Sequence, residues 1–112
     1  MFGLDEHIIY EIISVFEDYL SIEKATIFGS RALGNYKPGS DIDIALYGSN
    51  LTINDCLKIS AKLNESLPIP YHFDIVNYLT LKNLSLKFHI DTEGKILYER
   101  KYLSMSTALF LP

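Results

Sequence analysis

Two acidic residues occur in a pattern that could hold divalent metal ions. Asp41 and Asp43 lie two residues apart in segment 41–47, where alternation and isoleucine content predict a strand. Successive side chains of a strand point to opposite faces, so both carboxylates share one face, roughly 7 Å apart. They repel each other unless a cation lies between them, and Mg²⁺ prefers such oxygen ligands. An isolated Asp-x-Asp pair is nevertheless more often a solvated strand edge.

A third acid, Asp74, lies in the apolar segment 73–76, which predicts another strand. An acid among residues that favour burial needs a reason. If this strand lies beside that of Asp41 and Asp43, the three carboxylates can hold two Mg²⁺ ions about 4 Å apart, as in displacement reactions at phosphorus. Considered alone, Asp74 would be an edge-strand residue or a turn cap.

A candidate phosphate-binding turn follows the short buried strand predicted for residues 25–28. Gly29 lets the backbone approach a phosphate closely, and free N–H groups at a strand-to-helix turn favour an anion. Ser30 adds a hydroxyl donor, and Arg31 adds a positive charge that could meet phosphate. These three residues form the expected nucleotide-binding set.

Helices and strands alternate along the chain around these residues. Apolar spacing predicts a first helix over residues 4–20, with Asp5 as its N-cap. Thr52 and Asp55 fit a capping box that opens a helix to about residue 67, and Thr80 would cap another through about residue 90. The remaining strands are expected over residues 71–78 and 95–99. This order predicts an α/β or α+β domain, with a mixed sheet of about four strands and helices packed on one side.

The motifs together resemble a known superfamily. The segments Ile27–Gly34 and Ser40–Leu46 contain the pattern Gly-Ser-x10-Asp-x-Asp, which resembles the DNA polymerase β-like nucleotidyltransferases and, more closely, the minimal nucleotidyltransferases. Segment 73–76 matches the third acid of that family, and residues 94–99 resemble its closing strand. One departure is Leu33, where the family often carries a second arginine; Arg31 and Lys37 remain as candidate phosphate contacts.

The resemblance implies a polymerase β-like domain over residues 1–100 that transfers AMP from ATP to a hydroxyl and releases pyrophosphate. Gly29 and Ser30 would hold the β- and γ-phosphates. Asp41 and Asp43 would coordinate two Mg²⁺ ions. Asp74 would complete the catalytic ion site and help to orient or deprotonate the attacking hydroxyl.

The resemblance also implies a partner protein. Minimal nucleotidyltransferases are commonly antitoxins that adenylylate a tyrosine of a HEPN-domain toxin. The small domain leaves acceptor recognition to another chain, in a homo- or hetero-oligomer, and the apolar tail 101–112 could supply contact area. Two alternatives are a nucleotidyltransferase for a small-molecule acceptor and a non-catalytic binding module that masks its partner.

Composition excludes several other classes. The 112 residues carry a net charge of −4 without a basic stripe, which argues against direct nucleic-acid binding. There is no basic segment before an N-terminal apolar run and no apolar run of about 18 residues, so neither a signal peptide nor a membrane span is expected. The single cysteine cannot form an internal disulfide and fits the reducing cytoplasm. His7, His72 and His89 lack metal-ligand spacing and are interpreted as surface or capping residues.

Overall fold

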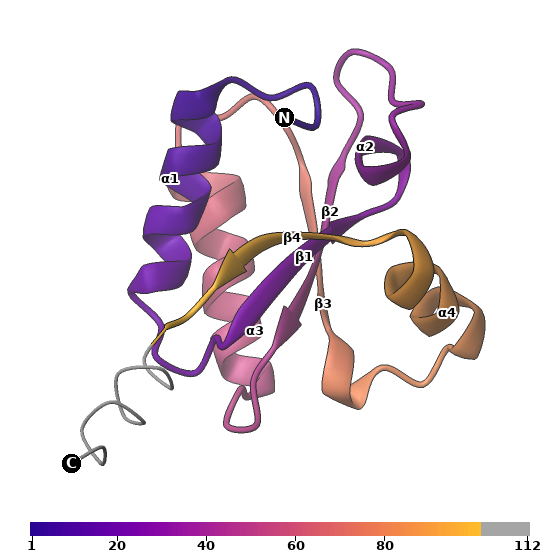
Figure 1. The fold of residues 1–112 in the computed structure, drawn as a ribbon. Helices are drawn as coiled ribbons and strands as arrows, with labels where there is room; N and C mark the ends of the chain where they lie inside the picture. Colours follow the sequence, from indigo (N-terminus) through magenta and orange to yellow (C-terminus); the bar gives the residue numbers. More distant parts are fainter. Residues whose placement is uncertain (102–112) are drawn as a thin grey trace, which may run out of the picture.

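The computed structural model describes residues 1–101 as helices packed on a four-stranded mixed sheet (Figure 1). The elements are α1 (Glu6–Glu17), β1 (Lys24–Phe28), α2 (Ser30–Leu33), β2 (Ile42–Tyr47), α3 (Ile53–Ala61), the π-helical turn η1 (Lys62–Ser66), β3 (Phe73–Asn77), the 3₁₀ turn η2 (Tyr78–Thr80), α4 (Leu84–Glu93) and β4 (Lys95–Glu99). The strand order is β3-β2-β1-β4. β1 is antiparallel to β2 and β4, whereas β2 and β3 are parallel, so the predicted mixed sheet is confirmed.

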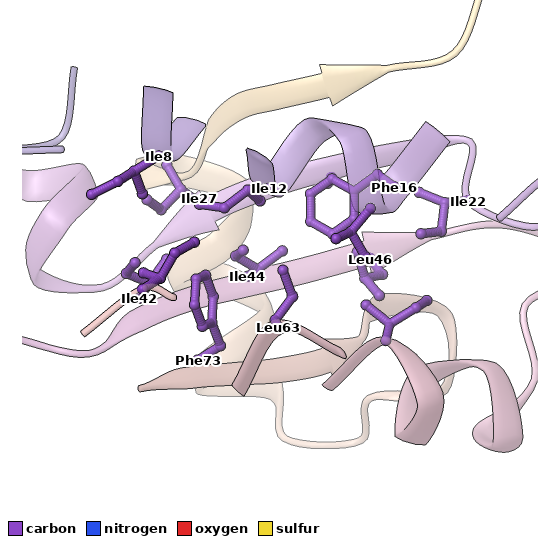
Figure 2. Packing of buried hydrophobic residues seen from close by; sticks show 14 of the residues in the cluster. Ile8, Ile12, Phe16, Ile22, Ile27, Ile42, Ile44, Leu46, Leu63 and Phe73 are labelled. Atoms are coloured by element: carbon purple, nitrogen blue, oxygen red, sulfur yellow. The ribbon is translucent and has the colours of Figure 1, made fainter. Parts of the chain in front are cut away.

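The main hydrophobic core lies between one face of the sheet and the helices α1 and α3. Figure 2 shows side chains from α1, the strands and η1 packed together there. The fully buried members include Ile12, Phe16, Ile44 and Phe73. Because side chains alternate along a strand, this packing assigns Ile42 and Ile44 to the core face and turns Asp43 to the other face, as the sequence predicted.

Helix α4 packs on the opposite face of the sheet, so the expectation that all helices lie on one side is wrong. Its Ile90 is buried with Phe28 of β1 and Ala45 of β2 in a second, smaller cluster. Figure 1 shows α4 separated from α1 and α3 by the sheet. The cause is that both inner strands carry apolar residues on both faces, which is typical of strands covered on both sides. Asp43 therefore shares its face with α4.

Side-chain hydrogen bonds mark the starts of α3 and α4, whereas Asp5 precedes α1 without a capping hydrogen bond from its side chain. The capping box is confirmed, since the Thr52 side chain accepts from the Asp55 N–H and the Asp55 side chain accepts from the Thr52 N–H. The expectation for Thr80 is wrong: it ends η2, and α4 begins after Asn83, whose side chain accepts from the Leu86 N–H. Thr and Asn are both favoured as N-cap residues, so tertiary packing decides whether α4 begins after Thr80 or after Asn83.

The parallel pairing of β2 and β3 requires a crossover, which α3 and η1 provide. The Asn64 side chain of η1 holds the start of β3 through hydrogen bonds to both the backbone N–H and the backbone carbonyl of Phe73. Its Oδ1 accepts from the Phe73 N–H at 2.7 Å, and its Nδ2 donates to the Phe73 carbonyl at 3.1 Å. This pair of bonds sets the position of the neighbouring Asp74.

Two sequence expectations concern the chain as a whole. The apolar tail expected over residues 101–112 lies, beyond Lys101, outside the described residues. Among the helices described for residues 1–101, none has the length and apolar character needed to cross a bilayer.

Arg100 joins the end of β4 to the end of α1. Its Nη2 donates to the carbonyls of Phe16 at 3.2 Å and Tyr19 at 2.9 Å, and its Nε donates to that of Ile22 at 3.0 Å. The last carbonyls of a helix have no intrahelical partner, and a cation is favoured there. Arg100 thus closes the C-terminal end of α1 against the sheet.

Replacing Arg100 by alanine is expected to lower the free energy of unfolding by about 1 to 3 kcal/mol, because part-buried carbonyls lose a charged donor. Urea unfolding followed by circular dichroism measures the change. Lys101→Ala at the exposed neighbouring position is the control and should unfold like the parent protein. Equal stability of the Arg100→Ala variant and the control would show that this contact stabilises nothing.

Candidate active site

The parallel strands bring two of the three predicted acids side by side. Asp43 of β2 and Asp74 of β3 are partners in the β2–β3 register, as expected if the strands were neighbours. Asp41 immediately precedes β2 and is exposed. The Asp74 side chain is 54% exposed and lies 3.2 Å from Nε2 of His72, which is 61% exposed, in agreement with its interpretation as a surface residue.

The Asp43 carboxylate lies in an environment that disfavours its charged form. Its pKa is raised from 3.8 to about 6, first because burial penalises the charged carboxylate and then because Asp74 and Asp41 carry the same charge. Unpaired carboxylates at this spacing therefore make the negatively charged form of Asp43 costly.

The acids fit a metal site in which a bound substrate supplies the remaining oxygen ligands. Within residues 1–101, no three or more Asp, Glu, His or Cys side chains converge closely enough to hold an ion by themselves. Asp43 and Asp74 do supply two adjacent carboxylates, with Asp41 within electrostatic range. Mg²⁺ is usually bound by one or two carboxylates together with substrate phosphates and water. The donor set thus suits Mg²⁺ accompanied by a phosphate-bearing substrate.

Gly29 forms a sharp turn directly against Asp43. Its backbone has φ +73° and ψ −156°, a conformation that residues with a Cβ rarely adopt. A Cβ atom at this position would clash with the Asp43 carboxylate. Ser30 follows as the first residue of α2, so the Gly-Ser turn and the acid are brought together as the motif predicted.

The Gly29 N–H is not free, contrary to the sequence expectation. It donates to His89 Nε2 of α4 at 2.9 Å. The His89 ring also meets the edge of Phe28 at a centroid distance of 6.1 Å and an interplanar angle of 74°. The interpretation of His89 as a surface or capping residue is therefore wrong. No local motif links residues 60 positions apart, so only the packing of α4 on this face reveals the contact.

Arg31, expected from the sequence to meet phosphate, is buried, with only 3% of its surface exposed. Its Nε and Nη2 donate to the Ser40 carbonyl at 3.1 and 2.9 Å, and its Nη1 donates to the Phe2 carbonyl at 2.9 Å. The guanidinium lies over the rings of Tyr36 and Tyr71 at 5.1 and 4.7 Å. In this structure Arg31 thus holds the backbone of Ser40, the residue that precedes Asp41.

In metal-free protein, Asp43→Asn is expected to increase stability at about pH 8, because it removes a charge that folding makes costly. The folded pKa lies above the unfolded value, so the parent takes up this proton as the pH falls through about 6 and the gain disappears toward about pH 4. Urea titrations across this range measure the effect. Asp18→Asn, at the exposed end of α1, serves as control. A gain of equal size at every pH would contradict the assignment.

Arg31→Lys is expected to lower the free energy of unfolding by about 1.5 to 3 kcal/mol, because an ammonium group cannot reproduce the planar fork that reaches two carbonyls. Thermal and urea unfolding measure the loss, with the exposed Lys82→Ala as control. Unchanged stability combined with weaker ATP binding would instead return Arg31 to the role of a direct phosphate contact.

Solved structures share this fold at low sequence identity. A chain of a toxin–antitoxin complex with AMP-PNP superposes with a TM-score of 0.66 at 23% identity, covering 95% of this chain and 90% of that chain. A chain of the complex between a tri-AMPylated HEPN toxin from Shewanella oneidensis and its MNT antitoxin gives 0.65 at 20% identity, covering 95% and 89%. A chain of the toxin–antitoxin MntA-HepT gives 0.64 at 21%, covering 94% and 89%.

Sequence comparison defines the family. A comparison with curated proteins finds no match. The family model described as Polymerase beta, Nucleotidyltransferase matches residues 10–103, which include the Gly29–Ser30 turn and all three acids. Because the match extends over most of the chain and agrees with the fold and the paired acids Asp43 and Asp74, this protein belongs to the polymerase β nucleotidyltransferase family.

Proposed function

We propose that this protein is a magnesium-dependent adenylyltransferase that transfers AMP from ATP to a tyrosine hydroxyl of a HEPN-type toxin and thereby acts as its antitoxin. The observation that carries the chemistry is the juxtaposition of Asp43 and Asp74 on paired strands, beside the Gly29–Ser30 turn. Family membership supports the class of reaction. We propose that residues 1–100 form the catalytic domain and that it works in the cytoplasm, where ATP is supplied.

Each part of the site has a proposed task. Asp41, Asp43 and Asp74 would hold Mg²⁺, and the Gly29–Ser30 turn would hold the β- and γ-phosphates, with Ser30 as the donor and Gly29 as the residue that lets the backbone come close. When bound, Mg²⁺ would neutralise the carboxylates and the phosphate oxygens. Asp74 lies on the edge strand β3 and is partly exposed, so an acceptor hydroxyl can reach it from solvent. There it could orient the hydroxyl or accept its proton.

The choice of acceptor is supported by the partners of structurally similar chains. One such complex was solved with AMP-PNP, and another holds a HEPN toxin carrying three AMP groups. These proteins are 20 to 23% identical to this chain. Modification of a partner protein therefore fits the fold, and we extend it to this protein as the proposal.

The decisive experiment incubates the protein with Mg²⁺, ATP labelled in its α-phosphate and a HEPN-type toxin as the acceptor. Label is expected on a toxin tyrosine, identified by mass spectrometry. Asp41→Ala combined with Asp43→Ala should reduce the transfer by on the order of 10³-fold, because Mg²⁺ and the triphosphate lose their shared ligands. The exposed Asp18→Ala variant should transfer normally.

Other outcomes identify the alternatives. If the double variant still neutralises the toxin completely, the protein acts as a binding module that masks its partner. If label appears on an added small molecule such as an aminoglycoside rather than on the toxin, the acceptor assignment is wrong. Absence of Mg²⁺-dependent ATP binding at millimolar ATP would overturn the nucleotide site itself.

A further inference from the structure

His89 connects helix α4 to the turn at the centre of the candidate site. Its Nε2 accepts the part-buried Gly29 N–H, and its ring packs edge-on against Phe28. The adjacent Ile90 is buried in the cluster with Phe28 and Ala45, which anchors α4 on the sheet at this point. The ring is therefore held between the helix that carries it and the strand that ends at Gly29.

The hydrogen bond from the Gly29 N–H defines which nitrogen of the His89 ring carries the hydrogen. A backbone N–H can only donate, so Nε2 must be unprotonated and a neutral ring carries its hydrogen on Nδ1. A part-buried N–H without an acceptor is unfavourable, so loss of the imidazole would drive the Gly29 amide to seek another partner. The turn has little freedom to do so, since Gly29 already packs against the Asp43 carboxylate and Ser30 begins α2.

We propose that His89 is a positioning residue for nucleotidyl transfer: its Nε2 holds the Gly29 amide so that the Gly29–Ser30 turn keeps its place against Asp43 and is ready for the triphosphate. The inference rests on the proposed function, because it gives His89 a part in that reaction. His89 acts through the turn and need not touch the nucleotide. The opposite role, in which His89 blocks an amide that a phosphate needs, predicts the opposite change in ATP affinity.

The contact itself is tested without catalysis by NMR on ¹⁵N-labelled protein. In the parent, long-range ¹⁵N–¹H correlations should show His89 in the Nδ1–H tautomer, and the Gly29 amide should exchange slowly. His89→Ala should expose this amide to exchange, whereas His89→Gln should retain protection, because the glutamine amide oxygen can accept in place of Nε2. His7→Ala on the exposed side of α1 is the matched control and should leave Gly29 unchanged. A Gly29 amide equally protected in all variants would overturn the proposal.

The role in nucleotide binding is tested by calorimetry with Mg²⁺ and ATP and by initial rates with the toxin. His89→Ala, once shown to be folded by circular dichroism, should weaken ATP binding and raise KM for ATP by about 10- to 100-fold, by analogy with residues that orient the ligands of a metal ion. His89→Gln should recover most of this loss, and His7→Ala should behave as the parent. Tighter or unchanged ATP binding in His89→Ala, or no recovery by glutamine, would overturn the proposal.

The two proposals fail in different ways. A parent protein that binds ATP but transfers no AMP would remove the proposed function. The exchange of the Gly29 amide and the ATP affinity of the two His89 variants would still decide the positioning role.

Discussion

The parallel pairing of β2 with β3 is the constraint on which the rest of this structure depends. It fixes Asp43 opposite Asp74 and demands a crossover, which the capped helix α3 and η1 supply. Asn64 then holds the first residue of β3 through both of its backbone polar groups. The repulsion between the two acids is tolerated because the opposite faces of the same strands are buried in the main core. Hydrophobic packing on one face of these strands thus offsets the repulsion between the carboxylates on the other face.

The second half of the site is assembled around the first by backbone contacts. Gly29 lets the chain pass closely by the Asp43 carboxylate, and Arg31 reaches the Ser40 carbonyl just before Asp41. The buried guanidinium has carbonyl dipoles and two tyrosine faces as its surroundings. A buried guanidinium that loses its acceptors destabilises the folded state strongly. Arg31 therefore favours a single arrangement of the Gly-Ser turn and the start of β2. One side chain therefore links the two loops of the site.

Most of the framework could be predicted because it follows from local signals. The four strands, the capping box at Thr52 and the shared face of the acids are expressed in alternation, helix-start chemistry and spacing. The side of the sheet that α4 covers, its start at Asn83 and the contact of His89 depend on packing between distant segments, for which no local pattern exists. Arg31 illustrates a related limit. Its charge suggested a phosphate contact, whereas its burial and its carbonyl acceptors decide its role.

The strand order has a consequence for how the domain assembles. β1 lies between β2 and β4, yet its partner β4 comes almost 70 residues after it in the chain. During synthesis β1 can pair with β2 early, while its other edge stays open until β4 has left the ribosome. An open, apolar strand edge is prone to pair with another chain, and distant pairings close slowly. The domain is therefore most vulnerable to misassembly late in translation, when β1 can pair with β2 but α4 and β4 have not yet covered β1.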